Sequence, residues 1–214
     1  MILVKPSHKI LRITEEAEEL IELAGRLCYK TEGKMGDGTA LEFVRKRIKT
    51  GHESIIEHAV ITVHFITDTG VTHEEVRHRL CAYSQESTRY CNYKGGVAFV
   101  IPPWMPDLAE GEYLPGSKYP LPHDAGEYWF MAMMDAERYY ETLLMHNWTP
   151  QMARDVLPKS LKTEIIHTAN IREWRHILNL RTSKAAHPQM VELMLPLLKE
   201  LKERLPVFFE DIGE

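Results

Sequence analysis

Residues 58–79 read HAVITVHFITDTGVTHEEVRHR and contain a switch from one predicted secondary structure to another. The first half, 58–68, is rich in β-branched residues and alternates with polar ones, which predicts a strand. Thr72 followed by Glu75 matches a capping box, so we expect a helix to start there and to carry Arg77, His78 and Arg79. A strand followed by such a helix indicates a mixed α and β fold.

The predicted helix would separate its two arginines. Successive residues on a helix turn by about 100°, so Arg77 and Arg79 would point about 200° apart. Val76, Leu80 and Tyr83 would then form the buried apolar stripe. Either one arginine has no ligand, or the segment stands between two ligands.

The chain continues with SQESTR at 84–89, which is rich in hydrogen-bond donors. Hydroxyl groups, loop N–H groups and Arg89 beside a helix end are suited to bind a phosphate. The alternative is a solvated helix with surface arginines. The hydroxyl-rich loop that follows favours a binding site over that alternative.

The remaining predicted elements are mostly helical. A strand is expected at 1–5, and a turn followed by a strand at 93–101. Helices are expected at 13–29 with Thr14 as cap, at 39–50, at 124–146, and from Pro150 after Thr149. Another helix is expected to begin with Asn170 as its cap, and Glu173 is placed three residues on to reach back to that cap. The last helix is expected from Pro188 to the C-terminus with a kink at Pro196, and its apolar face would consist of Met190, Leu193, Leu197, Leu201 and Leu205. The buried candidates on the 124–146 helix are Met131, Met134, Tyr139 and Leu143. The proline-rich segment 102–122 predicts a long, stiff loop.

These elements predict the class α/β (α+β): one helix-rich domain over residues 1–214 with a modest central sheet. Because the helices run on to the C-terminus without βαβ alternation, a doubly wound Rossmann fold is not expected. The chain also lacks the G-x-G-x-x-G and Walker glycine patterns, so any nucleotide is held by other means.

The predicted helix NIREWRHILNLR (170–181) has one apolar and one polar face. Ile171, Trp174 and Leu178 form the apolar stripe. Arg172, Arg175, His176 and Asn179 form the polar stripe, and a surface position explains Arg175. Arg181 continues the apolar stripe, where an arginine needs a fixed partner, so it is the best binding or catalytic candidate here.

A metal site is not predicted. The segment GHESIIEH (51–58) is neither H-E-x-x-H nor H-x-x-E-H, and histidines six apart fall on opposite faces of a helix. A ligand role for His52 or Ser54, or a helix cap at Ser54, is the favoured interpretation.

Composition limits the possible partners. The 214 residues carry a net charge of -5, so general binding to nucleic acids or membranes is not expected. The three cysteines form no C-x-x-C pair, which is typical of a reducing compartment. Without an N-terminal apolar block, we expect a cytoplasmic protein.

The ordered set Arg77, His78, Arg79 and Ser87 resembles the R-H-R-x7-S signature of flavin-dependent thymidylate synthases. The likeness extends through Arg89-Tyr90, back to GHESIIEH, and on to LPKSLKTEIIHTANIREWRHILNLRTSKAAHP (157–188), so it covers most of the chain. It implies the thymidylate synthase-complementing type of fold.

The resemblance implies that dUMP is methylated to dTMP. The carbon would come from 5,10-methylenetetrahydrofolate, NADPH would reduce a bound FAD, and the flavin would supply the hydride. It also implies a homotetramer with active sites shared between subunits.

The resemblance also assigns the site residues. The implied FAD contacts are Ser54, Arg77, His78, Arg79, Gln85, Asn170, Arg172 and His176. The implied nucleotide contacts are Glu74, Glu75, Val76, Arg77, Gln85, Glu86, Ser87, Thr88, Arg89, Arg154 and Arg181. Arg181 would be catalytic, because an arginine beside the pyrimidine can stabilise negative charge on the ring.

Gln85 and His176 stand where some members have glutamate and asparagine. Cys81 is interpreted as a small packing residue on the helix, not as a nucleophile. Two other functions are open: a different flavin or nucleotide enzyme on the same scaffold, and a nucleic-acid-binding module, which the acidic net charge disfavours.

Overall fold

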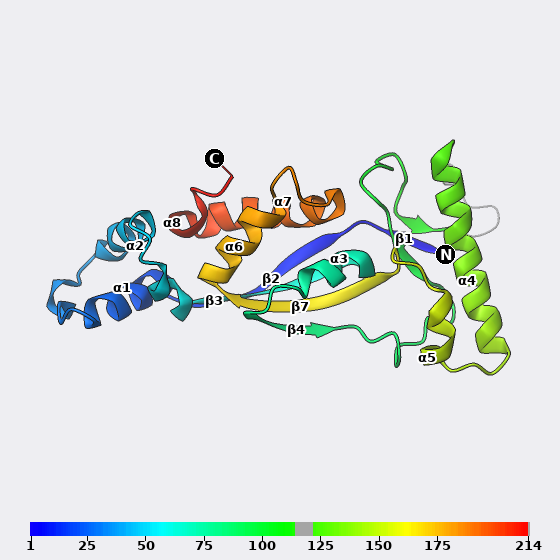
Figure 1. Ribbon diagram of the computed structural model, residues 1–214, viewed down its shortest axis with the longest axis horizontal. Coiled ribbons are helices and arrows are strands. Elements are labelled where there is room, and N and C mark those ends of the chain that lie inside the picture. Colours follow the sequence, from blue (N-terminus) through cyan, green and yellow to red (C-terminus); the bar gives the residue numbers. More distant parts are fainter. Residues whose placement is uncertain (114–121, 214) are drawn as a thin grey trace. The chain divides into compact units, whose positions relative to one another are not determined.

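The computed structural model describes residues 1–113 and 122–213 (Figure 1). Close packing divides the chain into two compact units. The first comprises Met1–Ser7, Phe65–Arg77 and Ser84–Ile165, and the second comprises His8–His64, His78–Tyr83 and Ile166–Glu214. The single domain over 1–214 stays a prediction.

A small sheet and a long helix form the core of the first unit. β1 (Ile2–Val4) pairs in parallel with β5 (Ala98–Val100) and antiparallel with β6 (Gly111–Glu112). Helix α4 (Ala125–Met145) packs beside β1 (Figure 1). Leu3 and Phe99 are fully buried in this core. The predicted strands at 1–5 and 93–101 are therefore confirmed, while the loop predicted over 102–122 includes β6 and extends into 114–121, outside the described residues.

The buried face of α4 differs from the prediction. Met131, Met134 and Tyr139 are 54%, 46% and 52% exposed. The buried face instead consists of Phe130, Met133, Ala136 and Tyr140, and Leu143 is partly buried against the same core, as expected. Large apolar residues occur on both sides of this helix, so periodicity alone does not identify its core-facing side.

The helix expected to carry the arginines ends before them. Helix α3 spans Thr69–Glu75 and begins at Asp68, whose Oδ1 accepts a hydrogen bond from the Val71 amide at 2.9 Å. The cap thus lies upstream of Thr72, and the helix ends at Glu75. Leu80 is 74% exposed, so the predicted buried stripe of Val76, Leu80 and Tyr83 is wrong. Because α3 ends at Glu75, the prediction that one helix carries Arg77 and Arg79 on opposite sides is also wrong.

Short helices complete the first unit. They are α5 (Pro150–Ala153), with Pro150 at its first turn as predicted, and the 3₁₀ helix η3 (Arg154–Val156).

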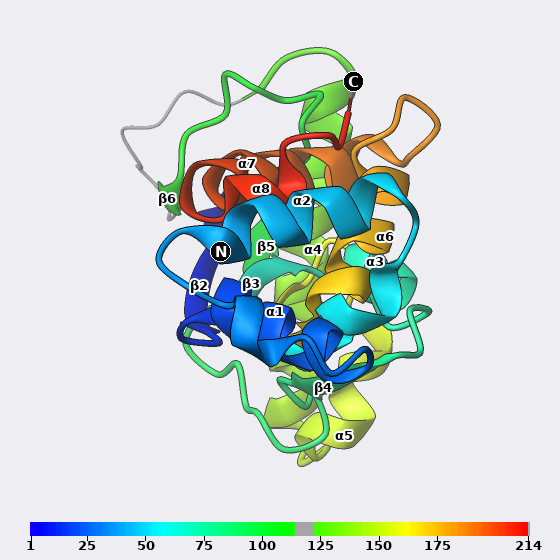
Figure 2. The same ribbon diagram turned by 90° about the vertical axis from the view of Figure 1, so that its left-hand side faces the viewer.

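Helices dominate the second unit. Their bounds are α1 (Ala17–Leu27), η1 (Glu32–Lys34), α2 (Thr39–Lys49), η2 (Glu53–His58), α6 (Ile171–Arg181), α7 (Pro188–Arg204) and α8 (Pro206–Phe209). Helix α8 contacts both α2 and α7 (Figure 2). The apolar face predicted for α7 is buried, including Met190, Leu193, Leu197 and Leu201.

Thr14 does not cap α1. Its hydroxyl donates to the Val60 carbonyl at 3.3 Å and accepts from the Val60 amide at 2.9 Å. The α1 cap is Glu16, which has a left-handed φ of 49° and makes no side-chain cap bond. The Thr14 hydroxyl, which the local pattern assigned to the cap of α1, therefore bonds to the backbone of Val60, a residue distant in sequence.

A second sheet has the strand order β2-β3-β7-β4. Its strands are β2 (Ser7–Ile13), β3 (Val60–Asp68), β4 (Cys81–Gln85) and β7 (Lys162–Asn170). The strand predicted at 58–68 is confirmed as β3. Cys81, expected on a helix, lies on β4, and neither β2 nor β7 was predicted.

The mixed α/β class is confirmed. No doubly wound parallel sheet forms among the residues that the structure describes, in agreement with the prediction against a Rossmann fold. None of the helices in those residues is both long and apolar enough to cross a bilayer.

Candidate functional site

The junction of β7 and α6 positions most of the candidate side chains in the second unit. Asn170 ends β7 and caps α6, because its Oδ1 accepts a hydrogen bond from the Glu173 amide at 2.8 Å. Trp174 is fully buried, and its Nε1 donates to the Ile61 carbonyl at 3.0 Å. The cap predicted at Asn170 and the buried stripe are confirmed. Since Trp174 is fixed, the opposite face of α6 is directed away from the core.

A cavity of about 1180 Å³ lies along this face of α6. Four residues predicted to contact flavin line it: Arg79, Asn170, Arg172 and His176. The volume exceeds the ~300–1,000 Å³ typical of small-ligand pockets, so a dinucleotide is a reasonable size of ligand. Ser54, on η2, is exposed and lies outside this set of lining residues.

Ion pairs occupy two of the arginines in the cavity. Arg172 Nη1 lies 2.6 Å from Glu57 Oε1, and this hydrogen bond raises the pKa of the guanidinium. Arg175 makes a bidentate contact with Asp211, at 2.7 and 2.8 Å. The surface interpretation of Arg175 is therefore wrong: its side chain is 12% exposed and also donates to the Phe208 carbonyl.

Arg79 differs from these two arginines. Its side chain is exposed, lines the cavity, and forms no ion pair with any residue in 1–113 or 122–213. A guanidinium in this setting can accept an anionic group without first giving up a carboxylate.

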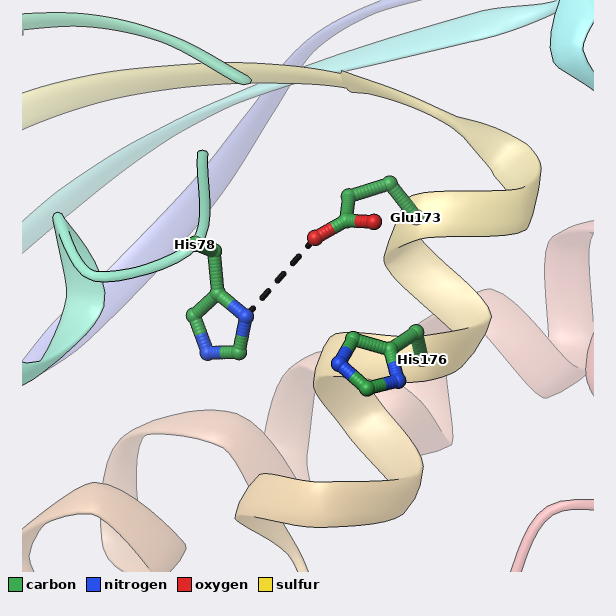
Figure 3. Close-up of side chains that lie close together, drawn as sticks. All are labelled: His78, Glu173 and His176. Carbon is green, nitrogen blue, oxygen red and sulfur yellow. Dashed lines mark ion pairs between the residues drawn. The ribbon is translucent and has the colours of Figure 1, made fainter. Parts of the chain in front are cut away.

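His78, Glu173 and His176 form a compact cluster in which the three side chains converge (Figure 3). His78 belongs to the segment after α3, and the other two side chains come from α6. His78 Nδ1 lies 3.7 Å from Glu173 Oε1, and His78 Nε2 accepts a hydrogen bond from Arg181 Nε at 3.0 Å. The sequence-predicted candidates His78, His176 and Arg181 are thus brought together.

Burial lowers the pKa of His78 to about 4, with further lowering by the positive charge of Arg181 and by His176 and His167. The imidazole is therefore neutral at pH 7, consistent with its role as acceptor toward Arg181. Arg181, the arginine predicted to need a fixed partner, thus donates to a neutral ring nitrogen of His78.

The expected nucleotide contacts of the first unit begin at the end of α3. Glu74 and Glu75 end that helix, and Val76 and Arg77 follow it. Glu75 is fully buried, whereas Arg77 is exposed.

Gln85 is held by two hydroxyl groups of the first unit. Its Nε2 donates to Thr72 Oγ1 at 3.0 Å and to Thr163 Oγ1 at 3.3 Å. These two bonds fix the orientation of the Gln85 amide and use its two N–H donors, so the amide oxygen is the group that can accept a further hydrogen bond.

The loop after β4 gathers hydroxyl and guanidinium groups. Arg154 Nη1 donates to Thr88 Oγ1 at 2.9 Å, which joins residues far apart in sequence. Ser87 Oγ accepts from the Arg89 amide at 3.4 Å, and the Arg89 guanidinium lies 5.4 Å from the centre of the Tyr90 ring. These contacts bring the donor groups together, and the binding of a phosphate by this loop stays a prediction.

Glu86, in contrast, has internal partners. Its Oε1 accepts from the Tyr93 hydroxyl at 2.7 Å, and its Oε2 lies 3.2 Å from Lys162 Nζ. Burial and the hydrogen bond from the hydroxyl to Glu86 raise the pKa of Tyr93. Through these contacts Glu86 links the loop after β4 to Tyr93 and Lys162, which is a structural role.

Sequence reasoning assigned no site role to two residues that the structure places here. Glu173 was assigned only to the cap of α6, yet its carboxylate faces His78. Cys81 lines the cavity from β4. The spacing Glu173-x-x-His176 could have indicated the first, because residues three apart on a helix share a face.

The lowered pKa of His78 predicts a pH-dependent stability. Unfolded histidine titrates near ~6.5, whereas folded His78 titrates near about 4. Between these values the unfolded chain binds a proton that the folded chain does not, so stability falls as the pH drops from about 6.5 toward 4. We expect His78→Asn to lose less stability than wild type between pH 7 and pH 5, measured by urea unfolding. The exposed His146→Asn is the control, and equal pH dependence in wild type and His78→Asn would contradict the prediction.

Comparison with known proteins finds one matching family and several named relatives. Residues 9–207 match the family described as thymidylate synthase complementing protein. A flavin-dependent thymidylate synthase of Corynebacterium aurimucosum is 32% identical over 204 residues, which cover 92% of this chain and 80% of the relative. An enzyme of the same name from Mycobacterium sp. (strain JLS) is 33% identical over 212 residues, which cover 92% of this chain and 80% of the relative. Another from Mycobacterium tuberculosis is 33% identical over 203 residues, which cover 90% of this chain and 78% of the relative. The family match includes the 77–90 segment and all of α6.

Proposed function

We propose, because the chain belongs to the thymidylate synthase complementing protein family, that it is a flavin-dependent thymidylate synthase. Its reaction is the reductive methylation of dUMP to dTMP, with 5,10-methylenetetrahydrofolate as carbon donor and NADPH as the source of electrons. The observation that carries this proposal is that Arg79, Asn170, Arg172 and His176, four of the residues that the family resemblance assigns to FAD, line one cavity together.

The donor set of the cavity fits an FAD molecule. FAD carries an anionic pyrophosphate and a flat, hydrogen-bonding ring system, and Arg79 offers a guanidinium that no described carboxylate neutralises. Arg172 could join it by exchanging Glu57 for the ligand. When bound, the flavin supplies the hydride; the chain's own residues bind and orient it.

The loop after β4 would bind the nucleotide. Ser87, Thr88, Arg89 and Arg154 bring hydroxyl and guanidinium donors to one place, and such charge-assisted bonds are suited to a phosphate. The Gln85 amide, fixed by Thr72 and Thr163, would present its oxygen.

Arg181 would act on the pyrimidine. Methylation at carbon 5 requires negative charge to develop on the ring, and a fixed guanidinium stabilises such charge. The hydrogen bond from Nε to His78 restricts the orientation of the guanidinium plane before substrate arrives. In this role the chain needs no cysteine nucleophile.

The whole chain, 1–214, would work as one domain within a homotetramer whose active sites draw residues from more than one subunit. The lining of the cavity supports this arrangement. It holds Arg79, Arg172 and Arg175 against four carboxylates, of Glu53, Glu57, Glu173 and Asp211. One chain alone therefore gives the cavity no excess of positive charge for a pyrophosphate, and a neighbouring subunit would supply it. We also place the enzyme in the cytoplasm.

Tritium release tests the proposed function directly. Protein incubated with dUMP labelled at carbon 5, methylenetetrahydrofolate, NADPH and FAD should release tritium to water and form dTMP. Omitting FAD from flavin-stripped protein should abolish both signals. A yellow protein that neither binds dUMP nor releases tritium under reducing conditions would instead be a different flavin enzyme on this scaffold.

A further inference from the structure

Three side chains form a continuous line from a carboxylate to the guanidinium of Arg181. Arg181 Nε donates to His78 Nε2 at 3.0 Å, and Glu173 Oε1 lies 3.7 Å from the other ring nitrogen, Nδ1. His78 and Glu173 are 7% and 9% exposed. A buried carboxylate is costly unless it has a partner, and the side chain that Figure 3 places opposite Glu173 is His78.

The contact with Arg181 identifies which ring nitrogen of His78 carries the proton. Arg181 Nε can only donate, so His78 Nε2 must accept and cannot hold a proton. A neutral imidazole has one N–H, which must then be on Nδ1, directed toward Glu173. The 3.7 Å separation is longer than a hydrogen bond, and such contacts often tighten when a ligand binds.

The same cluster could be interpreted as a metal site. Donor atoms of His78, Glu173 and His176 lie within 4.8 Å of one another, and two histidines with a glutamate are a common zinc set. A metal on His78 Nδ1, however, would leave the ring proton on Nε2, facing the N–H of Arg181. Metal-bound histidines normally direct that proton at an acceptor, so the polarity around His78 opposes a metal here.

We propose that Glu173 is a positioning residue for thymidylate synthesis: through His78, it keeps the acceptor nitrogen facing Arg181 and so orients the guanidinium. This inference rests on the proposed function, in which Arg181 acts on the pyrimidine. Glu173 faces His78 from the same helix as Arg181 and His176, while His167 faces it from β7.

The first test measures the tautomer of His78 and does not depend on activity. Holoenzyme labelled with ¹⁵N-histidine should show His78 protonated at Nδ1, its signals being assigned by their loss in His78→Asn. Glu173→Ala should shift the signals toward protonation at Nε2. Glu173→Gln should retain the wild-type tautomer, because the amide oxygen still accepts from Nδ1–H.

A matched control is available in the same unit. His8 Nε2 and Glu200 Oε2 form a second histidine–glutamate pair, at 2.9 Å, with no assigned part in the reaction. Glu200→Ala removes a carboxylate from a histidine without touching His78, and both the His78 signals and the methylation rate should stay as in wild type.

The second test separates methyl transfer from flavin reduction. We expect Glu173→Ala to lower tritium release by about tenfold to a hundredfold, the effect of one hydrogen bond to a charged group, with Glu173→Gln recovering most of it. Anaerobic reduction of bound FAD by NADPH should fall by a clearly smaller factor than tritium release, because that step does not use Arg181.

Each result has a distinct meaning. Wild-type His78 protonated at Nε2, or an unchanged methylation rate in folded Glu173→Ala, would overturn the proposal. So would stoichiometric Zn²⁺ binding by wild type that is lost in both Glu173→Ala and His176→Asn. Wild-type protein that shows the expected tautomer but releases no tritium would refute the proposed function instead.

Discussion

Replacing Arg181 with alanine should lower the rate of dUMP methylation by about 10²–10³-fold, because a fixed charge beside the reacting ring is lost. Arg181 Nε is held by His78 at 3.0 Å, so the guanidinium is oriented before the reaction begins. Flavin content, measured by absorbance of the purified protein, should remain at the wild-type level. The rate is measured as tritium release at saturating dUMP.

Two further variants sharpen this test. Arg181→Lys retains the positive charge but lacks both the Nε donor and the planar fork, so it should recover only part of the activity. Arg138→Ala is the control, since Arg138 is an exposed residue of α4 that pairs with Asp135 at 2.9 Å. If folded, flavin-loaded Arg181→Ala methylates at the wild-type rate, the charge must be stabilised by another group.

Mixing two inactive variants should restore activity if each active site takes Arg77 from one subunit and Arg181 from another. Arg77→Ala and Arg181→Ala should each be nearly inactive alone. After the two are unfolded together and reassembled at equal amounts, about a quarter of the sites should hold both wild-type arginines. Tritium release should therefore rise from near background to about a quarter of the wild-type rate.

The control is a mixture of Arg181→Ala with the double variant Arg77→Ala/Arg181→Ala, in which no arrangement of subunits gives a site that contains Arg181. Flavin content and the mass of the oligomers, with the two chains carrying different tags, establish that mixed tetramers have formed. Mixed tetramers of Arg77→Ala and Arg181→Ala that stay as inactive as their parents would place both arginines in the site of one chain. The shared-site tetramer would then be wrong.

Local patterns were sufficient for several elements. The alternation at 58–68 predicted β3, and Asn170 was correctly identified as the cap of α6. The buried stripes of α6 and α7 also followed from their period. In each case the signal depends on residues a few positions apart, whose hydrogen bonds and burial are decided within one element.

Competition between local signals misled the prediction around Arg77. Thr72 to Glu75 is a valid capping box, yet Asp68 caps α3 further upstream and the helix stops at Glu75. The next residues leave the helix, and 81–85 pairs as β4 with β7. Strand pairing depends on a partner distant in sequence, so the local pattern could not reveal it.

By itself, the sequence determined the mixed α/β class, the cap and buried stripe of α6, and a set of candidate side chains that includes His78, His176 and Arg181. Only the tertiary structure decided that Arg175 is bound to Asp211, that Arg181 donates to His78, and that Glu173 faces the same imidazole. The physical reason is distance along the chain. Helix caps and stripes arise from neighbours in sequence, whereas these contacts exist only after β7 and α6 have packed and the segment after α3 has been placed beside them.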